Sequence, residues 1–317
     1  MKRRNFLSST GAAFWAAMTQ RWFSRPAQAT SASVQLPRRL FKDDIHLSVI
    51  GFGGIVVMGM EQPKADAIVA ESYDQGINYY DVAPSYGDGE AEHKLGIALK
   101  PLRNRVFLAC KTTQRNAAGA RAELEQSLTR LHTDHFDLYQ FHAVTTLQEV
   151  EEIFAPGGAV ETFEKARQEG MIRYIGFSAH SVAAALAMLD RFDFDSILFP
   201  INFVCYGQGN FGPQVVQRAK EKGVARLALK ALAYTPWPEG MKRNYPKCWY
   251  RPVDELELAA KAMGFTLSED ITSAIPPGEE ALFRMAVKLA GKFEAMSAEA
   301  REALLAGTEG LQPLFRA

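Results

Sequence analysis

The sequence contains few cysteines. Cys110, Cys205 and Cys248 are the only three in 317 residues, and each lies in or near an apolar or aromatic run. An odd, scattered set without C-x-x-C spacing argues against a disulfide framework and offers no thiolate cluster to a structural zinc ion. We therefore expect three buried free thiols and no metal site.

Net charge, long apolar runs and a phosphate-binding glycine fingerprint are also lacking. The chain has 36 basic and 36 acidic residues, so nothing in its charge indicates a nucleic-acid partner. Its N-terminal apolar run, "GAAFWAAM", is far shorter than the roughly 18 residues that span a bilayer, so we expect no stable membrane span. The glycines of "GFGG" (51–54) are too closely spaced for G-x-G-x-x-G, which leaves a Rossmann domain unsupported.

The first 29 residues differ from the rest of the chain. They contain no acid, and their basic residues are Lys2, Arg3, Arg4, Arg21 and Arg25. The order is a basic start, a short apolar run and small residues up to Ala29, which is typical of a secretory signal. "KRRNFL" (2–7) resembles the twin-arginine export motif. We expect a signal peptide at 1–29, recognition by the twin-arginine machinery, cleavage near Ala29 and a periplasmic protein; a basic tail on a cytoplasmic protein is the alternative.

Residues 30–317 alternate between short apolar runs and amphipathic helical stretches. Eight such strand–helix pairs follow one another, from "LSVIGFGG" (47–54) to "ITSAIP" with the helix after it (271–293). Strands that alternate with helices predict a parallel sheet, and eight units in about 240 residues favour a single (β/α)₈ barrel domain. We expect an N-terminal hairpin from "LPRRLFKDDIHL" (36–47) and an extra C-terminal helix from "SAEAREALLAGTEG" (297–310). The long segment 234–252, rich in tryptophan and tyrosine, is either a lid or substrate wall, or a packed surface loop.

Polar residues interrupt the apolar runs at the ends of successive predicted strands. They are Asp81 with Tyr86 just beyond it, Lys111, His142 and Ser178. Each has an ordinary structural explanation on its own, such as a helix cap for the aspartate. Because the C-terminal strand ends of such a barrel meet at one mouth, we expect these side chains to converge there and build an active site.

The segments that hold these residues resemble the aldo-keto reductase family. The similar stretches are "INYYDVAPSYG" (77–87), "SLTRLHTDHFDLYQFH" (127–142), "IRYIGFS" (172–178) and "ITSAIPPG" (271–278). The resemblance implies a catalytic tetrad of Asp81, Tyr86, Lys111 and His142 in a nicotinamide-dependent oxidoreductase acting on an aldehyde, ketone or sugar-like carbonyl. Tyr86 would exchange the proton, and the Lys111 ammonium would lower its pKa, while Asp81 keeps Lys111 charged and His142 orients the carbonyl.

The resemblance also implies a set of cofactor contacts. These are Ser178, Asn202, Lys230, Gly278, Glu279 and Arg284. Ser178 would bind the nicotinamide amide group, Lys230 the pyrophosphate, and Gly278 with the following helical turn a phosphate or ribose. The chain departs from the family pattern at Ala179, Leu198 and Leu229, where asparagine, glutamine and an aromatic residue are usual.

The segment after the last strand, "PPGEE" (276–280), decides the expected cofactor. Relatives that prefer NADP(H) usually carry a lysine or arginine here, whereas Glu279 and Glu280 would repel a 2′-phosphate and Arg284 would compensate. NADP(H) is the family default and NAD(H) its competitor. Two other functions stay open: an epimerase-like enzyme that keeps its cofactor bound through each turnover, and a non-catalytic nucleotide-binding subunit of a membrane partner.

Overall fold

The computed structural model describes residues 35–317, which lie in one compact unit, Val34–Ala317. The predicted signal peptide, its twin-arginine motif and the cleavage site near Ala29 fall outside the described residues. Within the described range, no helix is both long and apolar enough to cross a membrane.

Eight parallel strands form the barrel. They are β3 (Phe52–Gly53), β4 (Tyr79–Asp81), β5 (Phe107–Thr112), β6 (Phe136–Val144), β7 (Ile172–Ala179), β8 (Ser196–Pro200), β9 (Ala225–Leu229) and β12 (Ser273–Ile275). The sheet order runs from β3 to β9 in sequence and ends with β12. A parallel bridge between Ile50 and Ala274 joins the two edges, with a 2.9 Å hydrogen bond from Gly51 N to the Ala274 carbonyl. The closed ring leaves no free sheet edge, as the repeat pattern predicts.

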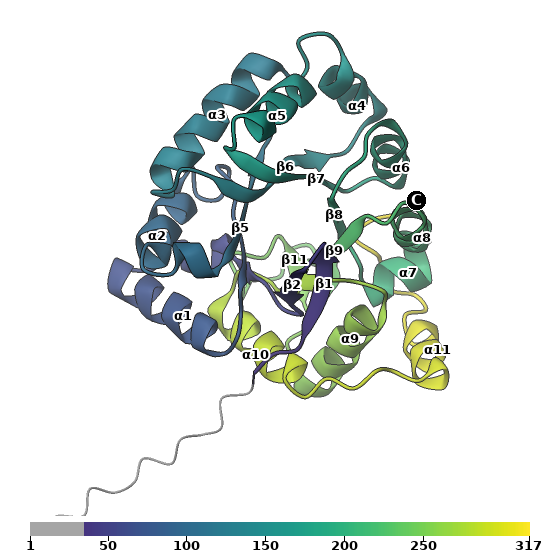
Figure 1. Ribbon diagram of the computed structural model, residues 1–317. Helices are drawn as coiled ribbons and strands as arrows, with labels where there is room; N and C mark the ends of the chain where they lie inside the picture. Colours follow the sequence, from purple (N-terminus) through teal and green to yellow (C-terminus); the bar gives the residue numbers. More distant parts are fainter. Residues whose placement is uncertain (1–34) are drawn as a thin grey trace, which may run out of the picture. The chain divides into compact units, whose positions relative to one another are not determined.

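Helices surround the strands, as Figure 1 shows. They are α1 (Gln62–Asp74), α2 (Glu90–Leu99), α3 (Ala117–Arg130), α4 (Leu147–Phe154), α5 (Ala159–Gln168), α6 (Val182–Arg191), α7 (Phe203–Gly209), α8 (Pro213–Glu221), α9 (Leu256–Ser268), α10 (Glu280–Ala290) and α11 (Ala298–Ala306). Side-chain caps start several of them: Asn116 accepts from Gly119 N, and Ser181 from Ala184 N. The short 3₁₀ turns η1 (Gly54–Val57) and η2 (Arg103–Arg105) complete the set.

Side chains alternate between the barrel interior and the helix layer. Tyr79 belongs to the inner core with Phe107 and Leu138, whereas its neighbour Tyr80 belongs to the outer core between strands and helices. Asp81 shares the inner face with Tyr79 because the side-chain period of a strand is two. This alternation points the polar residues at the strand ends into the barrel mouth.

An N-terminal hairpin closes the opposite end of the barrel. Strands β1 (Arg38–Lys42) and β2 (Ile45–Ser48) pair antiparallel, and the Phe41 ring centroid lies 5.0 Å from that of Phe107 and 5.3 Å from that of Tyr174. The expected hairpin and the extra C-terminal helix, α11, are both present. The hairpin keeps water out of the barrel floor beneath the mouth.

The segment 234–252 follows β9 and forms an ordered loop. Strands β10 (Ala233–Pro236) and β11 (Tyr250–Pro252) pair antiparallel at its base. The Trp237 indole Nε1 donates to the Cys248 carbonyl at 2.9 Å, and Lys247 Nζ donates to the Val56 carbonyl at 2.9 Å. These bonds carry the loop across the barrel mouth to η1.

Candidate active site

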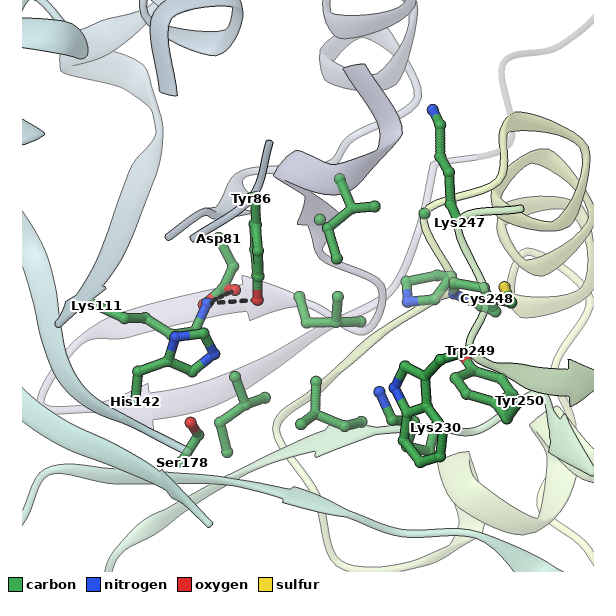
Figure 2. Close-up of a pocket in the computed structure, with 18 of the residues that line it drawn as sticks. Asp81, Tyr86, Lys111, His142, Ser178, Lys230, Lys247, Cys248, Trp249 and Tyr250 are labelled. Atoms are coloured by element: carbon green, nitrogen blue, oxygen red, sulfur yellow. Dashed lines mark hydrogen bonds and ion pairs between the residues drawn. The ribbon is translucent and has the colours of Figure 1, made fainter. Parts of the chain in front are cut away.

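A cavity of about 260 Å³ opens at the C-terminal ends of the strands. Its polar lining comes from Asp81, Tyr86, Lys111, His142, Ser178, His180, Lys230 and Lys247, and its apolar lining includes Ile55, Leu198, Leu229, Trp249 and Ile275. Figure 2 shows Tyr86, Asp81, Lys111 and His142 grouped on one side, with Lys230 and Trp249 across the space from them. The structure therefore brings the four residues of the expected tetrad into one cavity.

Lys111 lies at the centre of this group. Its ammonium forms an ion pair with Asp81 Oδ1 and also donates to the Val82 carbonyl at 3.2 Å and to the Tyr86 hydroxyl at 3.3 Å. The side chains of Lys111 and Asp81 are only 1% and 2% exposed. Burial alone would lower the pKa of Lys111, but Asp81 and Tyr86 outweigh it and the pKa is raised. Lys111 is consequently a permanent cation beside the phenol.

Tyr86 lies in the turn after β4, and two opposing effects act on its hydroxyl. Burial raises the pKa of Tyr86, Lys111 lowers it, and Asp81 raises it again. The net shift is upward, whereas the sequence suggested that the lysine would bring the pKa down. The difference arises because the site is dry enough for desolvation of the phenolate to exceed the attraction of one ammonium that is already paired. Tyr86 is thus a protonated donor near neutrality.

His142 faces Tyr86 from the end of β6. The two ring centroids are 5.8 Å apart with an interplanar angle of 85°. The His142 carbonyl accepts from Arg115 Nη2 at 2.7 Å, and Ala143 follows with a left-handed φ of 53°. Burial and then Lys111 hold the pKa of His142 well below its ordinary value, so the imidazole is neutral. Its buried Nδ1 has no hydrogen-bond partner among the described residues. A neutral imidazole of this kind suits a donor to a carbonyl oxygen.

Two further polar residues line the cavity: Ser178 beside His142, and Lys230 across the space from the tetrad. Ser178 Oγ accepts from Ala143 N at 2.8 Å, which leaves its hydroxyl proton free to donate into the cavity. The Lys230 ammonium lies 5.5 Å from the Trp249 ring centroid and 5.1 Å from that of Tyr250. Burial lowers the pKa of Lys230 to about 8. No carboxylate within residues 35–317 pairs with it. The only acidic side chain that lines the cavity in this part of the chain is Asp81, which is already paired.

The remaining expected cofactor residues separate into two groups. Gly278 lines the cavity and packs so closely that an added Cβ would lie 2.2 Å from Ile55 Cγ2. Asn202 does not line the cavity: its Oδ1 caps α7 and its Nδ2 donates to the Lys230 and Ala233 carbonyls. It acts through the backbone that presents Lys230.

Glu279 and Arg284 also lie outside the cavity. Glu279 Oε1 accepts from Lys247 N at 2.6 Å, which joins the loop 234–252 to the start of α10. Arg284 binds Glu71 at 2.6 Å and Glu280 at 3.0 Å. The cation that was expected to compensate for the two glutamates is therefore engaged by two carboxylates.

Several residues of the cavity were not among those predicted from the sequence. His180 lies just after β7, and burial followed by Lys230 lowers its pKa to about 4. Lys247, Trp249 and Tyr250 come from the loop 234–252. The aromatic content of that loop indicated a lid or substrate wall as one alternative, but it did not identify which of the loop's residues face the cavity.

Comparisons with known proteins show the family of the chain. Residues 49–247 match the model of the family described as "Aldo/keto reductase family". An uncharacterised oxidoreductase of Bacillus subtilis, YqkF, is 35% identical over 154 residues, 45% of this chain and 48% of the relative. L-galactose dehydrogenase of Arabidopsis thaliana is 27% identical over 239 residues, 71% of this chain and 73% of the relative. Several curated relatives, including YqkF, are thus matched over only about half of their length.

Solved structures extend the likeness to the whole barrel. The aldo-keto reductase AKR11C1 of Bacillus halodurans, in its holo form, superposes with a TM-score of 0.68 at 25% identity, covering 89% of this chain and all of that one. An aldo-keto reductase of Klebsiella pneumoniae in complex with NADPH superposes with a TM-score of 0.64 at 21% identity, covering 86% of this chain and 94% of that one.

Proposed function

The chain belongs to the aldo/keto reductase family, and from this premise we propose that it is an NAD(P)-dependent oxidoreductase that interconverts a carbonyl group and an alcohol. One observation carries the proposal. A buried carboxylate, ammonium and phenol form a continuous chain, and a neutral imidazole faces the phenol across a cavity. Such a chain can move a proton to or from an oxygen atom.

The side chains of the cavity suit a nicotinamide cofactor. The Lys230 ammonium, which pairs with no carboxylate among the described residues, attracts an anionic phosphate, the free Ser178 proton suits an amide oxygen, and Gly278, packed against Ile55, lines the same cavity. When bound, the reduced nicotinamide supplies the hydride. We propose Ser178, Lys230 and Gly278 as its contacts, with Asn202 holding the backbone around Lys230.

The chain's own residues perform the proton step. His142 donates to the carbonyl oxygen and fixes its direction relative to the Tyr86 hydroxyl. Tyr86 transfers its proton to that oxygen, and the Lys111 ammonium, 3.3 Å away, stabilises the phenolate that is left. Asp81 keeps Lys111 aimed. In the reverse direction the phenolate accepts the proton of the alcohol.

The substrate that fits is a small carbonyl compound. A cavity of about 260 Å³ is below the roughly 300–1,000 Å³ typical of sites for drug-sized ligands, so a small group shares it with the nicotinamide ring. Among the relatives, one is named L-galactose dehydrogenase and another, from Escherichia coli, methylglyoxal reductase. We propose short aldehydes, ketones and sugar-like carbonyls as the first substrates to assay.

Cofactor preference depends on the start of α10. The NADPH-bound Klebsiella structure supports NADP(H) as the family default. Against it, Glu279 and Glu280 stand at the helix start, and Arg284 is engaged by Glu71 and Glu280. We therefore propose NADP(H) with NAD(H) as a direct competitor, and comparison of the two dissociation constants decides between them.

Two hydrogen bonds of Lys247 favour an enzyme that keeps its cofactor between turnovers. Lys247 binds the Val56 carbonyl through Nζ and Glu279 through its backbone N–H, so the loop 234–252 is attached at the cavity mouth to the two neighbouring segments that follow β3 and β12. We propose that cofactor exchange requires release of these bonds. A slow cofactor off-rate supports the epimerase-like variant, and rapid exchange contradicts it.

We also propose that the protein is exported to the periplasm by the twin-arginine route. The support is the order of residues at 1–29, basic then apolar then small, with "KRRNFL" at its start. Replacement of Arg3 and Arg4 by lysine is expected to leave the protein in the cytoplasmic fraction of the host. Unchanged periplasmic recovery contradicts this route.

Tyr86→Phe tests the proposed function. It removes one hydroxyl and leaves the cavity walls intact, so we expect nucleotide binding within about twofold of wild type and loss of carbonyl reduction by at least about a thousandfold. Binding is measured by protein fluorescence and turnover by nicotinamide absorbance. A Tyr86→Phe enzyme that reduces carbonyls at the wild-type rate excludes the role of Tyr86, and co-purification with a membrane partner without any activity favours the binding-subunit function.

A further inference from the structure

Asp81 uses both of its carboxylate oxygens, and only one of them faces Lys111. Oδ1 pairs with Lys111, while Oδ2 accepts from the Tyr79 hydroxyl at 3.1 Å and from Gln140 Nε2 at 3.0 Å. All four side chains are at most 2% exposed. Water does not compete with these bonds, so each one is strong and its loss leaves a buried group unpaired.

Strand geometry places these residues together. Tyr79 lies two residues before Asp81 on β4, so both side chains point into the barrel. Lys111 of β5 and Gln140 of β6 are direct partners in the parallel register. Three neighbouring strands thus build one network around a single carboxylate, directly below the cavity.

We propose that Tyr79 and Gln140 are positioning residues for the proton-transfer site: they hold Asp81 from behind, so that its other oxygen aims Lys111 at Tyr86. This inference rests on the proposed function and adds two residues beyond the tetrad. Two donors on Oδ2 restrain the rotation of the carboxylate about its long axis. They also draw negative charge away from the oxygen that faces Lys111.

Tyr79 and Tyr86 have different roles because their hydroxyls contact different groups: Asp81 Oδ2 for Tyr79 and the Lys111 ammonium for Tyr86. Burial, and then Asp81, raise the pKa of Tyr79 well above its ordinary value, so its hydroxyl stays a neutral donor at every working pH. Tyr86 instead contacts the Lys111 ammonium, which favours its phenolate. One phenol holds the carboxylate and the other exchanges the proton.

The expected direction of the effect follows from the charges around Tyr86. The groups that face it are Asp81 on β4, Lys111 and Cys110 on β5, and His142 on β6. Across the cavity stand His180 after β7, Lys230 after β9 and Lys247 of the loop. Asp81 raises the pKa of Tyr86, and removal of a donor from its Oδ2 concentrates its charge toward Lys111 and Tyr86. The pKa of Tyr86 therefore rises when either positioning residue is lost.

The chain offers a matched control in Tyr80. It is as buried as Tyr79, but it points into the helix layer, where its hydroxyl donates to the Val69 carbonyl at 3.4 Å. Tyr79→Phe and Tyr80→Phe delete the same atom from adjacent residues on opposite faces of β4. Any general cost of losing a buried hydroxyl affects both variants, whereas an effect through Asp81 appears only in Tyr79→Phe.

The test measures the ionisation of Tyr86 directly. The protein is labelled with ¹³C at the tyrosine ring carbon that carries the hydroxyl, Tyr86→Phe assigns the signal, and the signal is titrated in wild type, Tyr79→Phe, Gln140→Met and Tyr80→Phe. We expect the Tyr86 pKa to rise by about half a unit or more in Tyr79→Phe and Gln140→Met and to stay unchanged in Tyr80→Phe. The alkaline limb of kcat/KM for carbonyl reduction should move upward with it, with kcat about three- to tenfold lower.

The outcomes separate this inference from the proposed function. The NMR titration needs no substrate. If wild type reduces no carbonyl, the proposed function is wrong, but the titration still decides whether Tyr79 and Gln140 position Asp81. Identical Tyr86 titrations in all three variants and wild type overturn the inference. Gln140→Met reaches the same oxygen from another strand, which keeps the test decisive if Tyr79→Phe does not fold.

Discussion

Substitutions in the buried ion pair between Asp81 and Lys111 are expected to change the stability of the fold and the catalytic rate in different ways. We consider three variants: Asp81→Asn, Lys111→Met and the double variant. Asp81→Asn leaves an ammonium with 1% exposure and no carboxylate beside it; its acceptors are then all neutral, namely the new amide oxygen, the Val82 carbonyl at 3.2 Å and the Tyr86 hydroxyl at 3.3 Å. Lys111→Met leaves a carboxylate that keeps its two donors, Tyr79 and Gln140.

The expected magnitudes follow from burial. An uncompensated charge in a dry site costs about 3–5 kcal/mol of unfolding free energy, and we expect Asp81→Asn to reach this range. Over the roughly 280 residues that the structure describes, this corresponds to a Tm about 5–8 °C lower. Lys111→Met should cost less than Asp81→Asn, because the Tyr79 hydroxyl and the Gln140 amide still solvate the remaining charge. The double variant leaves no buried charge and should recover at least about 2 kcal/mol relative to the sum of the single losses.

The assay is a double-mutant cycle from denaturant unfolding, run in parallel with carbonyl reduction. Stability should return in the double variant while activity stays absent in all three, because the proton site needs both charges. Single losses that add without coupling would refute the reasoning, since they would mean that the two charges do not interact in the folded protein. Activity in the double variant would show that Tyr86 works without an adjacent ammonium.

The other predictions concern the cavity walls and the pH dependence of turnover. Lys230→Met should weaken nucleotide binding by about 10- to 100-fold. Because the pKa of Lys230 is about 8, the nucleotide affinity of wild type should fall above that pH, whereas the affinity of the variant should not depend on pH in this range. Fluorescence of the adjacent Trp249 measures both affinities. Gly278→Val should abolish nucleotide binding and lower Tm, because even a Cβ at this position would lie 2.2 Å from Ile55 Cγ2. Calorimetry measures both effects. Unchanged nucleotide binding would place the nucleotide at another site. The rate of alcohol oxidation should rise toward alkaline pH, because the pKa of Tyr86 is raised and the phenolate is the base. The rate of carbonyl reduction should not change with pH near neutrality. Steady-state rates that change with pH in the opposite directions would contradict the assignment of Tyr86.

The barrel and the cluster at its mouth were predictable because both depend on local patterns. Apolar runs that alternate with helices specify parallel strands whose ends converge, and four successive runs end in a polar residue. Helix α4 was missed although Thr146 and Glu149 form a capping box, a start signal that the sequence displays. Helix α7 is seven residues long and has no periodicity to detect.

The cofactor side was harder to predict because its geometry depends on tertiary contacts. Asn202 followed a strand and looked like a ligand-binding residue, but it caps the helix that sequence reasoning had missed. Lys247 reaches the cavity only because its loop binds Val56 and Glu279, two partners far away in the chain. Lys230 enters through a left-handed φ of 66°, a conformation that no local propensity announces.

Burial, more than charge, determines how this site handles a proton. The sequence suggested a phenol made acidic by a neighbouring ammonium, yet desolvation outweighs that attraction at Tyr86 and raises its pKa. A protonated Tyr86 is ready to donate and is a poor base until a ligand changes its surroundings. The ammonium of Lys111 then matters most after the proton has left, when it faces a phenolate in a dry cavity. A site of this kind lowers the barrier to carbonyl reduction without holding an ionised tyrosine at rest, so its resting state is poised for reduction more than for oxidation.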